Sequence, residues 1–149
     1  MQIETGGRFM AKANIKVTFL CPVEKVWNTV TNLSQYKWRS DIEKIQVIDE
    51  ETFIEVSKEG IKTKFTVVNK KEYELWEFTL DNKNIKGRWT GKFYRHGEKT
   101  TLDFTEEVHA KKIFMAPFVG GYLRKQQRQY LVDLKRKLGC QEASKIQAF

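Results

Sequence analysis

Glu106 is the residue whose position in this sequence is best suited to chemistry. It alternates with the apolar residues Leu102, Phe104 and Val108 in a segment typical of a strand. The alternation predicts that its carboxyl group points to the apolar side, where burial would raise its pKa and let it act as an acid, a base or a ligand anchor. Two structural alternatives stay open, and we favour them: a bulge turns Glu106 outward, or a lysine at the rim pairs with it.

Few other residues are candidates for a catalytic or metal-binding site. His96 falls in an expected turn, and His109 ends the last expected strand. Cys21 and Cys140 lie near opposite ends of the chain and form no CxxC pair, so neither a disulfide framework nor a metal site is expected. No catalytic or nucleotide-binding motif is present. The sequence therefore predicts no catalytic constellation, no metal and no cofactor.

The chain before residue 42 predicts one strand followed by two short helices. Residues 14–20 alternate apolar and polar side chains. Pro22 suits the first turn of a helix, and the apolar spacing that follows it fades near Asn32. Leu33–Ser40 resembles a second short helical turn that carries Trp38.

The next seventy residues predict consecutive strands joined by short turns, which is typical of an antiparallel sheet. The expected strands are 45–48, 52–57, 61–67, 74–80, 85–94 and 102–108.

Residues 116–138 carry the only long helical pattern, with an apolar stripe that ends before Gly139. The fold class is therefore α+β, a curved antiparallel sheet of six to seven strands around a long C-terminal helix. We expect residues 1–10 to be a disordered leader or a cloning remnant, 11–139 to be the domain, and 140–149 to be a C-terminal tail.

A curved sheet and a straight helix leave space between them. Gly87 and Gly91 share the predicted inner face with Trp89, and glycines often accompany sheet curvature. Such apolar concavities are the usual sites for small molecules. Each aromatic residue taken singly is more simply explained as core packing. The residues expected to face the same interior are Phe65, Trp76, Phe78, Phe93 and Phe104.

Composition narrows the class of protein. The 149 residues carry a net charge of +8 and suit one domain. No apolar run approaches the length of a membrane span, and two cysteines fit a cytoplasmic location.

The basic residues of the outer sheet face are interpreted as a solubilising surface with cross-strand pairs, and the alternative is transient contact with an anionic membrane. Nucleic acid is not favoured, because outward aromatic residues that could stack on bases are nearly absent. The basic residues are Lys62, Lys64, Lys86, Arg88 and Lys92.

Three groups of residues together resemble the START-like superfamily, also called SRPBCC or Bet v 1-like, and its polyketide cyclase/dehydrase group. These are residues 22–27 with 31–33 and 36–38, the hairpin around residues 91–102, and the segment 122–138. Asn32 departs from an aspartate that often stands at this position in the family. The resemblance spans about residues 13–138 and implies a helix-grip fold with a deep cavity. Known relatives bind lipids, sterols, plant hormones or polyketides, and a minority catalyse cyclisation or dehydration.

The leading functional hypothesis is non-enzymatic binding or transport of a hydrophobic small molecule or lipid, by a monomer or homodimer. One alternative is a polyketide cyclase or dehydratase that uses Glu106, and another is a module that binds anionic membrane or nucleic acid through its basic face. The expected cavity residues are Trp38, Phe65, Trp76, Phe78, Trp89, Phe93, Phe104, Glu106, Phe118 and Tyr122.

Overall fold

The computed structural model describes residues 10–140 and 147–148. The expected leader lies outside the described residues apart from Met10, which begins the first strand. The elements in chain order are β1 (Met10–Phe19), α2 (Val23–Thr31), β2 (Ile42–Val47), β3 (Thr52–Ser57), β4 (Lys62–Lys71), β5 (Leu75–Asp81), β6 (Ile85–His96), β7 (Lys99–Ala110), η1 (Ile113–Met115), α3 (Ala116–Leu138) and β8 (Gln147–Ala148).

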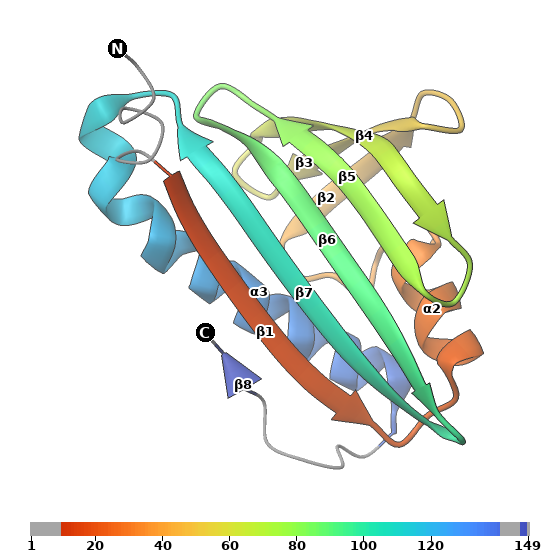
Figure 1. Ribbon diagram of the computed structural model, residues 1–149. Helices are drawn as coiled ribbons and strands as arrows, with labels where there is room; N and C mark the ends of the chain where they lie inside the picture. Colours follow the sequence, from red (N-terminus) through yellow and green to blue (C-terminus); the bar gives the residue numbers. More distant parts are fainter. Residues whose placement is uncertain (1–9, 141–146, 149) are drawn as a thin grey trace.

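The strands form one antiparallel sheet in the order β2-β3-β4-β5-β6-β7-β1-β8. Seven strands make the body of the sheet, and β8 adds a two-residue edge to β1. The strands from β2 to β7 follow one another through hairpins, whereas β1 crosses to pair with β7. The α+β class and the curved sheet around a long helix are confirmed (Figure 1).

Alternation along the strands decides which side chains face the helix. Ile15, Val17 and Phe19 of β1 are buried, and so are Leu102 and Phe104 of β7. These positions share one face because successive strand residues point to opposite sides. The buried residues make one core between the sheet and α3, which packs chiefly along β1.

Trp89 lies on the inner face in the space that a glycine leaves open. A Cβ atom placed on Gly91 would stand 2.5 Å from a ring carbon of Trp89. The indole of Trp89 can occupy this position only because Gly91, two residues further along β6, has no side chain. A register shift between Val67 and Asn69 of β4 adds an irregularity that is typical of bent sheets.

The closing helix α3 begins with Pro117 in its first turn and ends at Gly139. Gly139 has φ 69° and donates its N–H to the carbonyl of Lys135, which is the left-handed termination that glycine favours. The predicted end of the helix is confirmed. Its buried stripe is formed by Val119, Leu123, Leu131, Leu134 and Leu138.

The second short helix predicted over Leu33–Ser40 is wrong, because only α2 follows β1. At Asn32 the chain leaves the helical region with φ −81° and ψ 99°. The Asn32 side-chain oxygen accepts hydrogen bonds from the backbone N–H groups of Ser34 and Gln35 at 3.0 and 3.3 Å. Such local bonds offer the backbone an alternative to helix.

Contacts with distant elements hold the rest of this segment. The indole of Trp38 packs edge-on against Tyr130 of α3, with ring centroids 5.4 Å apart. The backbone N–H and hydroxyl of Ser40 donate to the buried carboxylate of Asp133 at 2.7 and 2.8 Å. The segment is therefore shaped by α3 rather than by its own helical spacing.

No disulfide framework was expected from the two cysteines, and the structure corrects this by joining them. Cys21 and Cys140 form a disulfide, with Cα atoms 5.9 Å apart. The bond links the loop after β1 to the end of α3, so residues 119 positions apart in sequence meet. Sequence spacing could not reveal this meeting, because it depends on how the helix crosses the sheet.

Candidate functional site

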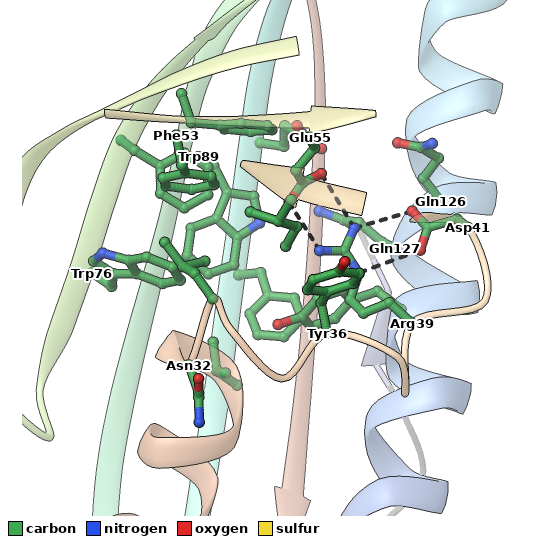
Figure 2. Close-up of a pocket in the computed structure, with 18 of the residues that line it drawn as sticks. Asn32, Tyr36, Arg39, Asp41, Phe53, Glu55, Trp76, Trp89, Gln126 and Gln127 are labelled. Atoms are coloured by element: carbon green, nitrogen blue, oxygen red, sulfur yellow. Dashed lines mark hydrogen bonds and ion pairs between the residues drawn. The ribbon is translucent and has the colours of Figure 1, made fainter. Parts of the chain in front are cut away.

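A cavity of about 100 Å³ lies between the inner face of the sheet and α3 (Figure 2). Its walls come from the strands β2 to β7, from α2 and the segment after it, and from α3. One end is aromatic and the other is polar. The aromatic end is formed by Phe53, Phe65, Trp76, Phe78, Trp89 and Phe104.

The aromatic end is tightly ordered by ring contacts. Phe78 and Trp89 stack with ring centroids 4.8 Å apart and planes within 3° of parallel. Phe53 and Phe65 stack at 4.9 Å, and Phe65 meets Phe78 edge-on at 5.0 Å. Because neighbouring rings fix one another, a flat apolar surface is already in place before any ligand arrives.

The polar end is organised by Arg39, whose guanidinium joins two carboxylates. Its Nη1 lies 3.0 Å from Glu55 Oε2, and its Nη2 lies 3.0 Å from Asp41 Oδ2 (Figure 2). The guanidinium also stands over the ring of Tyr130, 5.1 Å from its centroid. Burial alone would lower the pKa of Arg39, but Glu55 and Asp41 outweigh it and raise that pKa. Arg39 is therefore a permanent cation.

Glu106 borders the same cavity beside this ion pair. Among the described residues its carboxylate has no hydrogen-bond or ion-pair partner. Burial, helped by the charge of Glu55, raises the pKa of Glu106 from 4.5 to about 7, although Arg39 acts in the opposite direction. The residue is only partly screened from water because it faces an internal space rather than packed atoms. Glu106 thus changes its charge near neutral pH.

Side chains of α3 complete the polar end. Burial raises the pKa of the Tyr130 hydroxyl above its ordinary value, so this group keeps its proton at neutral pH. Gln127 is buried and donates to the carbonyl of Ala13 at 3.1 Å. Gln126 donates to the hydroxyl of Tyr122 at 2.9 Å. Donors and acceptors therefore face the cavity without adding charge.

Two further hollows follow from the cavity toward the start of α3, each sharing lining residues with the one before it. One of about 70 Å³ shares Arg39, Glu55 and Glu106 with the cavity. The other hollow, of about 220 Å³, shares Ile61, Asn82, Ile85 and Tyr122 with the 70 Å³ hollow. It is also lined by Phe118 at the start of α3. We call this outer hollow the mouth.

Exposed apolar side chains line the mouth, and two more precede them in the chain. Phe118 is 73% exposed and Tyr122 is 50% exposed. Ile113 and Phe114, which come just before them in the chain, are 67% and 70% exposed. Large apolar residues exposed together are uncommon on a monomer and mark surfaces that meet an apolar partner or ligand.

Most of the predicted cavity residues line these hollows. Trp38, Glu106 and the predicted inner aromatic residues other than Phe93 border the cavity. Phe118 and Tyr122 line the mouth. Phe93 is not among the lining residues and instead packs against Trp27 of α2, with ring centroids 4.9 Å apart. It differs because α2 covers that end of β6.

Sequence reasoning missed the ionic part of the site. Glu55 stands two residues from the inward Phe53 on β3, so strand alternation predicts that it faces inward, as it does for Glu106. Arg39 and Asp41 lie in an irregular segment with no periodicity, and no sequence signal could have placed them in the cavity.

The histidines lie away from the cavity. His96 and His109 are exposed at strand ends. Within residues 10–140 and 147–148, no group of three or more His, Cys, Asp or Glu side chains could hold a metal ion. No helix in that part of the chain is long and apolar enough to cross a membrane.

The outer face of the sheet carries charges of both signs. Arg88 Nη1 lies 3.7 Å from Glu77 Oε2, and Thr90 donates to the same oxygen at 2.8 Å. Lys92 stands opposite Asp103 in the pairing of β6 with β7. Cross-strand neighbours of opposite charge support the interpretation of this face as a solubilising surface.

Comparisons with known proteins agree with this architecture. Solved structures with the same fold include the Zhui aromatase/cyclase from Streptomyces sp. R1128, with a TM-score of 0.77 and 11% identity over 87% of this chain and 94% of that one. A START superfamily protein from Mycobacterium smegmatis has a TM-score of 0.76 and 13% identity over 87% and 97%. A conserved protein from Geobacillus kaustophilus has a TM-score of 0.76 and 13% identity over 88% and 98%.

At these identities the likeness shows the fold alone, and a search of curated proteins finds no match. The sequence profile described as polyketide cyclase / dehydrase and lipid transport matches residues 10–139. This match covers nearly the whole sheet and α3. The chain therefore belongs to the polyketide cyclase / dehydrase and lipid transport family.

Proposed function

We propose that this protein binds a hydrophobic small molecule in the cavity and carries it without chemical change. The observation that carries the proposal is the series of three hollows with shared walls, from the exposed mouth at Phe118 to the aromatic end at Trp89. A preformed apolar concavity with a few polar groups is the usual design of a small-molecule site. Family membership supports the same class of function.

The size of the space limits the ligand. The inner cavity of about 100 Å³ is smaller than the roughly 150 Å³ cavity that holds benzene in an engineered protein. Together, the three hollows stand near the lower end of the roughly 300–1,000 Å³ range of ligand pockets. The proposed ligand therefore places at most one ring against the aromatic end, and the rest of the ligand extends toward the mouth.

A neutral fluorescent dye, N-phenyl-1-naphthylamine, tests the proposal. Its emission should rise when its phenyl ring reaches the cavity of the wild-type protein and its naphthalene ring lies in the apolar mouth. Ile45→Trp should fill the cavity that Ile45 lines and reduce dye binding at least about tenfold. Val68→Trp is the matched control, because Val68 is 47% exposed on β4 and adds the same ring outside the cavity.

Two results would refute the proposal. One is a flat emission signal with no ligand detected by native mass spectrometry of gently purified protein. The other is equal dye binding by the Ile45→Trp and Val68→Trp variants, which would place the dye elsewhere.

A second candidate function is acid–base catalysis by Glu106. It is favoured by an unpaired carboxyl group in the cavity whose pKa of about 7 suits proton transfer at neutral pH. Dehydration of 4-hydroxy-4-phenylbutan-2-one is a suitable test. Glu106 would take the α-proton, the carbon–carbon double bond would form as the C–O bond breaks, and the same carboxyl group would return the proton to the leaving hydroxide, which departs as water. Wild-type protein should accelerate formation of the conjugated enone and Glu106→Gln should not. An unaccelerated reaction with the wild-type protein would remove this candidate.

The cellular compartment is part of the proposal. Two cysteines alone suggested the cytoplasm, but disulfides persist chiefly in oxidising compartments. The Cys21–Cys140 bond therefore supports an oxidising location. Alkylating free thiols at the moment of cell lysis, followed by mass measurement, would test it, and two alkylated cysteines would contradict it.

A further inference from the structure

The polar end of the cavity carries more negative than positive groups. Arg39 is a single cation, and both Asp41 and Glu55 are paired with it. Glu106 adds a third carboxyl group. Among the described residues that line the three hollows, Arg39 is the only basic side chain. The site is therefore negative by one charge when Glu106 is protonated and by two when it is ionised.

This balance decides which polar groups a ligand can bring inside. A ligand carboxylate would find its natural partner, Arg39, already engaged by two carboxylates at 3.0 Å. It would also be repelled by Glu106 in a space where charges are weakly screened. A hydrogen-bond donor meets the opposite situation, because the carboxylate of Glu106 has no partner among the described residues.

Resting on the proposed function, we propose that the cavity selects aromatic ligands whose polar end donates hydrogen bonds to Glu106, protonated amines above all, and rejects aromatic carboxylates. The ring lies against the aromatic end, and the donor reaches the polar end between β7 and α3. The faces of Trp89 and Phe104, which lie near Glu106 in the sheet, attract a cation further.

The preference depends on pH through the groups that face Glu106. Arg39 and Glu55 act on its charge from the segment after α2 and from β3, and Tyr122 and Tyr130 face the same space from α3. Both tyrosines keep their protons at neutral pH, since burial raises their pKa values. Glu106 therefore changes charge near pH 7 while the two tyrosines do not, and amine binding should strengthen as the pH rises from 6 to 8.

Three probes of similar size test the proposal: 2-phenylethylamine, 2-phenylethanol and 3-phenylpropanoate. Affinities are measured by nuclear magnetic resonance titration of the whole chain at pH 6 and pH 8. At pH 8 the amine should bind at least about tenfold more tightly than the carboxylate, the ratio expected for one hydrogen bond to a charged group. The alcohol should lie between them.

Glu106→Gln is the decisive variant, because it keeps the shape and removes the charge. It should reduce the ratio of amine to carboxylate affinity to below about threefold and abolish its pH dependence. Glu107→Gln is the matched control, since Glu107 follows on the same strand but stands opposite Lys12 and Arg88 on the outer face. This control should keep the wild-type ratio.

The outcomes separate this inference from the proposed function. If the alcohol and the neutral dye bind but the carboxylate binds as tightly as the amine, the charge selection is overturned and the proposed function stands. An unchanged ratio in Glu106→Gln also overturns it. If none of the three probes binds and the dye does not bind either, the proposed function itself fails.

Discussion

Replacing Glu106 with glutamine should stabilise the folded protein at alkaline pH and have little effect at pH 4.5. The reason is that burial raises the pKa of Glu106 from 4.5 to about 7. Between these values the folded state holds a proton that the unfolded state releases. Stability associated with this proton is fully present below pH 4.5 and is lost as the pH rises through about 7.

The size of the effect follows from the shift. Each pKa unit corresponds to about 1.4 kcal/mol, so ionised Glu106 lowers the free energy of unfolding by about 3 kcal/mol above pH 7. Glutamine has nearly the same shape and no charge to desolvate. Glu106→Gln should therefore raise the free energy of unfolding by about 3 kcal/mol at pH 8, or the Tm by about 6–12 °C.

Urea denaturation at pH 4.5, 6 and 8 measures the effect. The gain in Glu106→Gln should grow with pH, while Glu107→Gln should show no such growth because Glu107 lies on the outer face. A gain that is the same at all three pH values would refute the reasoning. It would mean that the carboxyl group of Glu106 titrates near its ordinary pKa.

Three other changes test the architecture. Cys140→Ser removes the bond to Cys21 and should lower the free energy of unfolding by about 2–5 kcal/mol, as measured in urea, because the bond closes a long loop. Asp133→Ala should cost about 3–5 kcal/mol by thermal denaturation, because its fully buried carboxylate accepts several hydrogen bonds. Gly91→Ala should cost about 1–3 kcal/mol and shift the emission of the protein, because the new methyl group displaces the ring of Trp89.

Matched controls separate the expected effect of each of the three substitutions from a general loss of stability. Cys140→Ser should match wild-type protein treated with reductant, and equal stability of oxidised and reduced wild type would argue against the bond. For Asp133→Ala the control is Asp103→Ala on the outer face of β7, and equal losses would contradict the special role of burial. Gly97→Ala would be strained by its φ of 64° without touching the indole, so an equal emission shift there would contradict the contact.

The fold could be predicted from local patterns because they are set by the backbone itself. A strand presents alternate residues to one face, and a helix presents a stripe, wherever the element lies in the molecule. These periods placed Phe78, Trp89 and Phe104 on the inner face and ended α3 at Gly139. The same alternation brought Glu106 to the cavity wall.

Two features depended on contacts between elements that are distant in sequence. Asn32 ends α2 with local hydrogen bonds, and the chain after it follows α3 instead of forming the expected helix. Phe93 has the same alternation as the cavity residues but is covered by Trp27. In both cases the local pattern was outweighed by a neighbour that only the folded chain supplies.

The sequence by itself determined the class of fold and the aromatic inner face, since both follow from backbone periodicity. For Glu106 the alternation allowed an inward carboxyl group, but an outward or lysine-paired position was the favoured interpretation, and the structure instead places Glu106 at the cavity wall. Only the tertiary structure decided that Arg39 forms ion pairs with Asp41 and Glu55. Glu106 is therefore left without an ion-pair partner among the described residues. The same holds for the bond between Cys21 and Cys140. The physical reason is that charge pairing and cross-linking depend on distances between segments, and the curvature of the sheet around α3 sets those distances.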